Sequence, residues 1–190
     1  MPDIAYINGK FVPLQEACVS LNDRAYYFAD AVYEVCTTFG GRLFIFDAHM
    51  DRLENSLRGV KIDYRVDRPY LTSLFEEGMR RAGYAESLVY LQISRGSGLR
   101  DKRFPNGPER NLVLTVREKR PIPVERFRQG IRVILVPDER WAHCNYKTVM
   151  LLPNVLAHQA ALDQGKDDAL FFHPEGEIVY EATSANLFLV

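Results

Sequence analysis

A single lysine, Lys147, separates a polar, turn-like run from a strongly apolar run within residues 138–165. Residues 149–152 predict buried chain, and Pro153 and Asn154 predict the start of an amphipathic helix that runs to about Asp163. An amine beside an apolar wall loses hydration, which favours its neutral form, and a neutral amine is the nucleophile that forms a Schiff base. The alternative is a lysine whose stem packs on apolar surface while its head reaches water.

Three further positions carry complementary chemistry. Arg52 projects from the start of a predicted helix, where a guanidinium could hold a phosphate oxygen. Glu181 ends a predicted strand beside a run of small polar residues that includes Thr183 and Ser184, and its carboxylate could accept a proton from a cationic ring. An imine-forming lysine, a ring-binding carboxylate and phosphate-binding groups are what pyridoxal phosphate needs. Arg52 could equally be a solvated surface residue and Glu181 a turn residue, and spacing alone does not show that they converge.

Other motifs indicate no additional chemistry. The G-x-G in residues 95–98 is followed by no helix and lacks the Lys-Ser/Thr of a P-loop, so nucleotide binding is not predicted. The four histidines show no metal-ligand spacing, and we predict no metal site. Tyr33, within a predicted strand, is either a core residue or a site residue.

Composition excludes several classes of protein. The 190 residues are 47% hydrophobic, enough for a core, and a formal net charge of −1 argues against a nucleic-acid-binding surface. No run of 18 apolar residues predicts a membrane span, and residues 1–14 lack the basic start and apolar core of a signal peptide. The three cysteines are odd in number and widely spaced, which indicates reduced thiols. We therefore predict a soluble, cytoplasmic, globular protein.

The elements that must position these residues begin with two hairpins. Residues 4–14 predict two short strands around the turn Asn8-Gly9, and residues 32–39 and 42–46 predict a second pair around Gly40-Gly41. Two helices follow. Asp47 is predicted to cap the first, whose apolar stripe is Met50, Leu53, Leu57 and Val60, and the second covers residues 69–82 and ends at Gly83.

The remaining pattern predicts an α+β fold in two domains. Strands at 87–95 and 111–117, joined by a polar loop at 95–109, complete a small N-terminal domain over residues 1–118. Residues 119–123 contain two prolines in three residues and form the predicted linker. Strands at 131–137, 168–172 and 178–181 belong to residues 124–190, which we interpret as the first part of a larger C-terminal domain. Residues 187–190 are apolar and strand-like, so the chain is expected to stop in mid-domain.

Six motifs in order resemble the class IV (fold type IV) pyridoxal-phosphate aminotransferases, and within them the D-amino-acid branch. The resemblance covers nearly the whole chain. The motifs are YINGKFVP (6–13), DRAYYFADAVYEV (23–35), HMDRL (49–53), RGSGLRDKRFP (95–105), DERWAHCNYKTVMLLPNVLAHQ (138–159) and EATSANLF (181–188).

The resemblance implies a role for each cofactor-binding position. Lys147 matches the Schiff-base lysine, which also moves the substrate proton, and Glu181 matches the carboxylate that bonds the pyridine nitrogen. Arg52 matches the phosphate-binding arginine. Ser184 matches a serine near the cofactor ring, with Thr183 beside it. The implied cofactor is pyridoxal 5′-phosphate, and the implied fold is the two-domain fold-type-IV architecture with its second domain incomplete.

The resemblance also implies the reaction, which is transamination between D-amino acids, such as D-alanine, and 2-oxo acids. Tyr33 and Arg100 match the residues that bind the substrate carboxylate, the arginine coming from the neighbouring subunit of a homodimer. Lys102 stands where the D-specific enzymes usually have a histidine, and a lysine is a flexible point charge rather than a fixed donor. Ala29 and Ala31 stand where glycines are common, which costs little unless a positive φ is required.

Three alternatives stay open at this stage. They are a class IV lyase such as aminodeoxychorismate lyase, a branched-chain aminotransferase, and an inactive dimerisation module.

Overall fold

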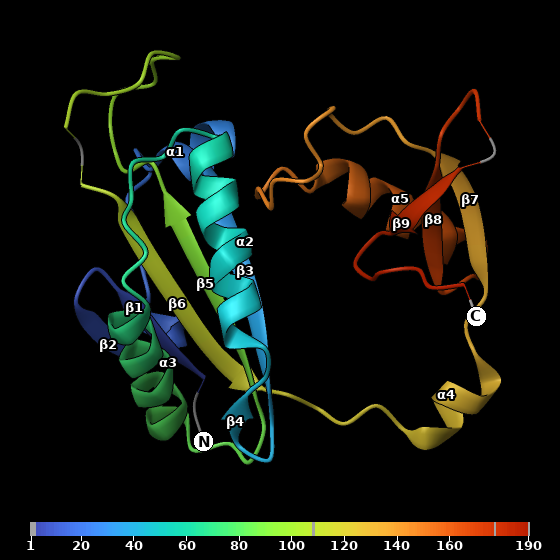
Figure 1. Cartoon of the computed structure of the whole chain (residues 1–190), viewed down its shortest axis with the longest axis horizontal. Coiled ribbons are helices and arrows are strands. Elements are labelled where there is room, and N and C mark those ends of the chain that lie inside the picture. Colours follow the sequence, from blue (N-terminus) through green and yellow to red (C-terminus); the bar gives the residue numbers. More distant parts are fainter. Residues whose placement is uncertain (1–2, 108, 177, 190) are drawn as a thin grey trace. The chain divides into compact units, whose positions relative to one another are not determined.

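The computed structural model describes residues 3–107, 109–176 and 178–189 (Figure 1). Pro108, in the predicted polar loop, and Val190, at the end of the predicted terminal strand, lie outside the described residues. The chain divides into two compact units, which are Met1–Arg120 with Asn145–Val149, and Pro121–Cys144 with Met150–Val190. The segment around Lys147 therefore belongs to the first unit, which a single division at residues 119–123 did not anticipate.

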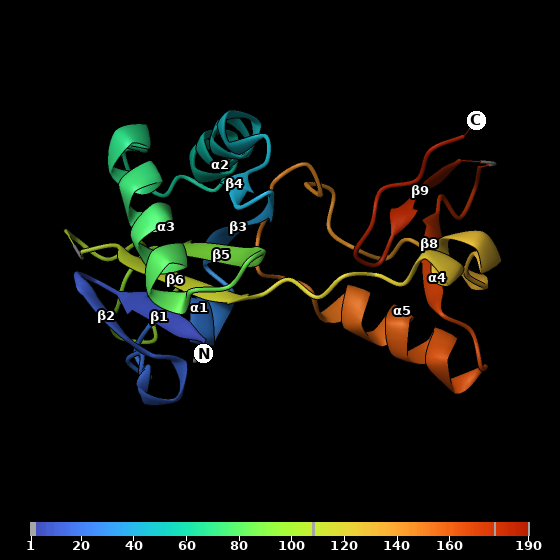
Figure 2. The same cartoon turned by 90° about the horizontal axis from the view of Figure 1, so that it is seen from below.

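A six-stranded antiparallel sheet in the order β2-β1-β6-β5-β3-β4 forms the first unit. Alternate residues of its central strands are buried, so one face of the sheet carries the core, and Figure 2 shows α2 and α3 on the same face. The elements of this unit are β1 (Ile4–Ile7), β2 (Lys10–Pro13), η1 (Leu14–Glu16), α1 (Arg24–Phe28), β3 (Ala31–Phe39), β4 (Arg42–Leu43), α2 (Phe46–Gly59), α3 (Arg68–Ala82), β5 (Ser87–Ser94) and β6 (Asn111–Glu118).

The two helices bury the stripes that their sequence spacing predicts. α2 buries Met50, Leu53 and Leu57, and α3 begins after Asp67, whose carboxylate accepts a hydrogen bond from the N–H of Tyr70. Gly83 ends α3 in the left-handed region, with φ of 69°. Both apolar stripes pack against β3, β5 and β6, and this packing fixes the helices on one face of the sheet.

One predicted cap is wrong. The residue before α2 is Ile45, with φ of 47° and no side-chain cap, because β4 ends at Leu43 and the chain turns sharply into the helix. Asp47 lies in the first turn instead, where an acidic side chain still interacts favourably with the helix dipole.

A short helix that periodicity did not reveal, α1, precedes β3. Asp23 caps it through a 2.7 Å bond from the N–H of Ala25, and Ala29 ends it with φ of 53°. Position 29 thus requires the positive φ that a glycine adopts more easily, so the alanine here is strained.

The second unit is a three-stranded sheet in the order β7-β8-β9, in which β7 and β8 are parallel and β8 and β9 antiparallel. α5 connects the two parallel strands and packs on them through Ala157 and Ala161, which meet Ala169 and Phe171 of β8. Residues 187–189 form no strand, contrary to the prediction, because no neighbouring strand among the described residues pairs with them. The elements are α4 (Val124–Gln129), β7 (Val133–Pro137), α5 (Leu152–Asp163), β8 (Asp168–Phe172) and β9 (Val179–Ala182).

Candidate active site

The main chain of Lys147 is fixed on both sides within the first unit. Its N–H donates to Oγ of the buried Ser56, at 2.9 Å, and its carbonyl accepts from the N–H of Tyr33, at 3.0 Å. Val149 continues this pairing by donating to the carbonyl of Ala31. Residues 147–149 therefore run alongside the start of β3 and take their position from this strand and from Ser56 of α2.

The Lys147 amine lies over an aromatic ring. Its Nζ is 4.4 Å from the centroid of Tyr33, which itself stacks on Tyr90 with centroids 5.4 Å apart. Alternation along β3 sends Tyr33 away from the helix-covered face, so the lysine and the two tyrosines share the opposite face. The Tyr33 ring limits the conformations of the Lys147 side chain on one side. The main-chain hydrogen bonds fix the position of the Lys147 backbone.

The predicted apolar wall is not the one that Lys147 contacts. Met150 and Leu151 are each 38% exposed and Leu152 is 67% exposed, because these residues lead into α5 instead of entering the first unit. The apolar surface beside the amine is the face of Tyr33, which is distant in sequence.

A glycine of α2 accommodates this segment. Tyr146, the residue before Lys147, packs its ring against α2 at Gly59. A Cβ at position 59 would lie 2.3 Å from that ring, so this packing requires a glycine.

Arg52 is held by a buried carboxylate, Glu34, on the helix-covered face of β3. Nε and Nη2 of Arg52 each donate to Glu34 at 2.7 Å, and Nδ1 of His49 lies 2.8 Å from the same carboxylate. Glu34 is fully buried, and burial alone would raise its pKa, but the hydrogen bonds from Arg52 and His49 outweigh burial and lower it. Nη1 of Arg52 takes no part in this pair, and the side chain is 46% exposed.

Replacing Glu34 with glutamine is expected to destabilise the protein by about 2–3 kcal/mol, because the buried bidentate partner of Arg52 loses its charge while keeping its shape. Urea unfolding of the wild type and Glu34→Gln measures the difference. Glu77→Gln is the matched control, since Glu77 also pairs with arginines but on the exposed surface of α3. Equal stabilities for Glu34→Gln and the wild type would contradict the assigned pairing.

Glu181 has one well-defined partner, Arg140, within the second unit. Nη1 of Arg140 donates to Oε1 of Glu181 at 2.5 Å, while Nε and Nη2 form a bidentate pair with Asp138 at 2.9 and 2.8 Å. Arg140 also lies 4.2 Å from the ring centroid of Phe171. The pKa of Asp138 is lowered, chiefly by the hydrogen bonds from Arg140. Oε2 of Glu181 takes no part in the bond to Arg140.

Thr183 and Ser184 differ in their surroundings. The Thr183 hydroxyl is buried and donates to Oδ1 of Asp168 at 2.5 Å, and its carbonyl accepts from Nδ2 of Asn154 in α5. Ser184 is exposed in the bend that follows. The hydrogen bond from the Thr183 hydroxyl to Asp168 therefore helps to fix this bend, whereas Ser184 lies on the surface.

Arg100 and Lys102 lie on the loop between β5 and β6, and both are exposed. The guanidinium carbon of Arg100 is 5.8 Å from the ring centroid of Phe28. The loop therefore presents both side chains to solvent.

A comparison with family models decides the family. The model described as "Amino-transferase class IV" matches residues 31–190. The chain belongs to the class IV aminotransferases. This confirms the resemblance drawn from the six motifs.

Relatives and solved structures agree with this assignment. A D-alanine aminotransferase of Staphylococcus epidermidis is 30% identical over 185 residues, which cover 97% of this chain and 65% of the relative. A PLP-bound hypothetical aminotransferase from Mycobacterium tuberculosis has a TM-score of 0.77 at 22% identity. The match covers 95% of this chain and 65% of the chain of that structure. The branched-chain amino acid aminotransferase of Escherichia coli has a TM-score of 0.84 at 16% identity. This match covers 96% of this chain and 63% of the chain of that structure. Together they confirm the α+β, fold-type-IV architecture.

Sequence reasoning about this class IV aminotransferase missed Glu34 and Arg140. Both stand inside motifs that were singled out, Glu34 next to Tyr33 and Arg140 seven residues before Lys147. For Glu34 the available signal was a charged residue at a position where strand alternation demands burial, which requires a buried partner. Arg140 follows the end of β7, so no such signal marked it. Within residues 3–107, 109–176 and 178–189, no cluster of His, Cys, Asp or Glu could hold a metal ion. No helix in that part of the chain is long and apolar enough to cross a membrane.

Proposed function

We propose that this class IV aminotransferase uses pyridoxal phosphate to exchange amino groups between D-amino acids, such as D-alanine, and 2-oxo acids, such as pyruvate or 2-oxoglutarate. The observation that carries the proposal is the Lys147 amine, set over the Tyr33 ring by main-chain bonds to Ser56 and Tyr33. The D-alanine aminotransferases among its relatives support the choice of substrate. The chain spans 65% of the length of such a relative, so the proposal concerns the whole enzyme.

The donor groups of the chain fit pyridoxal phosphate in kind. An amine that would hold the cofactor is provided by Lys147, and Nη1 of Arg52, outside its pair with Glu34, would donate to a phosphate oxygen. Oε2 of Glu181, outside the bond to Arg140, would accept a ring N–H. The exposed Ser184 hydroxyl and the turn at Thr183 would add hydrogen bonds.

Each residue then has a defined task. Pyridoxal phosphate, when bound, supplies a cationic ring that withdraws electrons from the substrate α-carbon. Lys147 would accept the α-proton at Nζ and later donate a proton from the same atom to the aldehyde carbon of the cofactor, because its main chain stays fixed while its flexible stem lets the amine move. Arg140 orients the carboxylate of Glu181 by holding Oε1. Glu34 orients the guanidinium of Arg52 in the same way.

Substrate carboxylate binding is assigned to Tyr33, Arg100 and Lys102. The exposed position of Arg100 and Lys102 on their loop fits a role toward the neighbouring subunit of a homodimer. A guanidinium pairs with a carboxylate through two parallel N–H bonds, which converts binding energy into orientation.

Borohydride trapping after incubation with pyridoxal phosphate, followed by peptide mass spectrometry, tests this function. We expect one adduct, on Lys147, that disappears when the protein is first treated with D-alanine but persists after treatment with L-alanine. An adduct that neither amino acid removes would refute the D-amino-acid substrate. Adducts spread over surface lysines such as Lys10 would refute the cofactor role and favour an inactive dimerisation module.

A branched-chain aminotransferase is the second candidate, because solved branched-chain enzymes share this fold with TM-scores up to 0.84 among those compared. Loss of the adduct on treatment with L-leucine, but not D-alanine, would favour it. A class IV lyase would instead release pyruvate from aminodeoxychorismate without a second oxo acid.

A further inference from the structure

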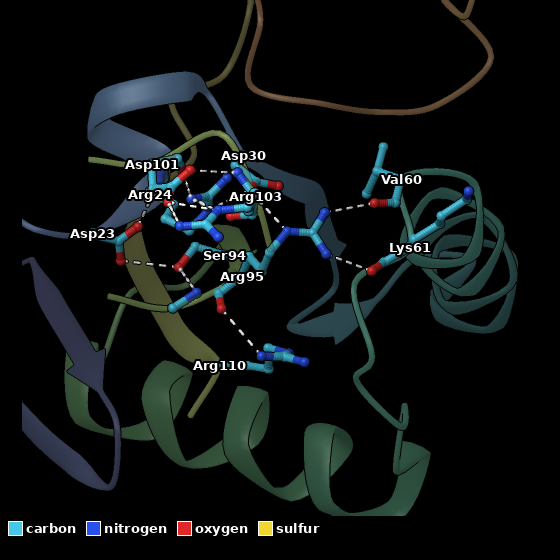
Figure 3. A network of polar contacts seen from close by, with 12 residues as sticks. Asp23, Arg24, Asp30, Val60, Lys61, Ser94, Arg95, Asp101, Arg103 and Arg110 are labelled. Carbon is cyan, nitrogen blue, oxygen red and sulfur yellow. Dashed lines mark hydrogen bonds and ion pairs between the residues drawn. The ribbon is translucent and has the colours of Figure 1, made fainter. Parts of the chain in front are cut away.

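Two buried arginines share one carboxylate at the base of the loop that carries Arg100 and Lys102. Oδ2 of Asp30 accepts from Nε of Arg24 at 2.7 Å and from Nε of Arg95 at 2.8 Å (Figure 3). Both arginine side chains are 5% exposed and the Asp30 side chain is 12% exposed. We call these three residues the Asp30 cluster. Neither the cofactor nor the substrate roles assigned above use it.

Arg24 extends from this cluster to the main chain of the loop. Its Nη1 donates to the carbonyl of Asp101 at 2.6 Å and to that of Arg103 at 3.3 Å, so the two carbonyls that flank Lys102 meet at one nitrogen. The N–H of Arg24 also donates to the carbonyl of Gly96, at 3.0 Å. One residue of α1 thus holds the loop at its beginning and near its middle.

Arg95 anchors the other side of the same cluster. Its Nη1 and Nη2 donate to the carbonyls of Lys61 and Val60 at the end of α2, at 2.5 and 2.7 Å. Its guanidinium carbon lies 3.7 Å from the ring centroid of Phe104, near the middle of the loop. The loop is therefore tied to the end of α2, the helix that carries Arg52, through the buried side chain of Arg95.

We propose that Arg24 is a positioning residue that holds residues 99–104 in one conformation and thereby presents Arg100 and Lys102 to a substrate carboxylate. This deepens the proposed function and rests on it for the identity of the ligand. The contacts of Arg24 are to carbonyl groups, so it fixes the backbone and leaves the side chains of Arg100 and Lys102 outward. Glycines and polar residues dominate this loop, and without such bonds its backbone would have several accessible conformations.

Lysine cannot replace Arg24 fully. A guanidinium presents donors in a rigid planar fork, which here lets Nε reach Asp30 while Nη1 reaches two carbonyls. The ammonium of a lysine is a single charged group on a flexible stem. A lysine at position 24 could keep either the pair with Asp30 or the hydrogen bonds to the loop carbonyls, but not both. Arg24→Lys is therefore expected to keep the fold and partly free the loop, whereas Arg24→Gln removes the charge as well.

Limited trypsin digestion of the chain, without cofactor, measures the loop directly. Trypsin can cleave after Arg100, Lys102 and Arg103 in the loop, and cleavage after the exposed Arg128 of α4 serves as an internal reference. We expect the ratio of loop to reference cleavage to rise about tenfold or more in Arg24→Gln and less in Arg24→Lys, since local cleavage follows the population of open loop. Arg80→Gln, which removes an exposed arginine of α3, should leave the ratio unchanged.

An unchanged ratio in Arg24→Lys would overturn the positioning role even if Arg24→Gln fails to fold. In the holoenzyme, Arg24→Lys is expected to raise the KM for D-alanine about tenfold while kcat stays within about threefold, because binding of the carboxylate is weakened more than the chemistry. A fall in kcat with KM unchanged would overturn the carboxylate assignment. A wild-type enzyme that does not transaminate would refute the proposed function and the ligand, while the cleavage ratio would still decide whether Arg24 holds the loop.

Discussion

Lys147→Ala is expected to abolish transamination, with the rate falling by at least about 10³-fold, because no other group provides both the amine and the proton transfer. Borohydride trapping should yield no adduct in residues 145–149. The variant should nevertheless fold with an unfolding free energy within about 0.5 kcal/mol of the wild type. The reason is that Ser56 and Tyr33 hold the main chain of this residue, and alanine retains both bonds.

Lys10→Ala, which removes an exposed lysine of β2, is the matched control and should keep full activity and the adduct. Turnover by Lys147→Ala at a rate near the wild type would contradict the assigned chemistry. A large loss of stability would show that the lysine side chain, and not only its main-chain bonds to Ser56 and Tyr33, holds this segment.

Arg140→Met is expected to destabilise the second unit by about 3 kcal/mol, because it leaves Asp138 with no cation in a site where both side chains are about one-tenth exposed. Urea unfolding followed by the fluorescence of Trp141, the neighbouring residue, measures the loss. Arg132→Met is the matched control, since Arg132 pairs with Asp167 at 3.7 Å with its side chain 71% exposed, and its loss should cost less than about 0.5 kcal/mol.

The effect of Arg140→Met should depend on pH in a definite direction. Arg140 lowers the pKa of Asp138, so the stabilisation is fully present above the ordinary pKa of an aspartate and is lost as the pH falls through the lowered value. The gap between the wild type and Arg140→Met should therefore narrow on acidification below about pH 4. A gap that stays constant down to pH 2 would show that packing on Phe171, and not the charge pair, carries the effect.

Local sequence signals predicted the elements of the first unit because those elements depend on near neighbours. Asn8 and Gly9 form their turn with φ of 43° and 101°, and Gly83 ends α3 where an αL residue is needed. α1 could not be predicted in this way. It has only five residues, and bonds to the distant residues Gly96 and Asp101 hold it in place.

The candidate site divides along the same lines. The residue types at Lys147, Arg52 and Glu181 indicated the chemistry, since imine formation, phosphate binding and ring protonation need those groups. Their immediate partners, Glu34 and Arg140, were not found, because hydrogen bonds between residues that are 18 and 41 positions apart leave no local pattern that pairs the two residues. For the same reason the apolar surface next to Lys147 was assigned to residues 149–152, whereas the Tyr33 ring provides it.

The pairing of residues 147–149 with β3 also covers a strand edge. At its start β3 is hydrogen-bonded to β5 on one side only, and the N–H of Tyr33 and the carbonyl of Ala31 on the other side are covered by this segment. Without it, the first unit would present an open strand edge, which is a template for pairing with another chain. The segment that bears Lys147 thus covers the start of β3, and we expect loss of this pairing to expose that edge as well as displace the lysine.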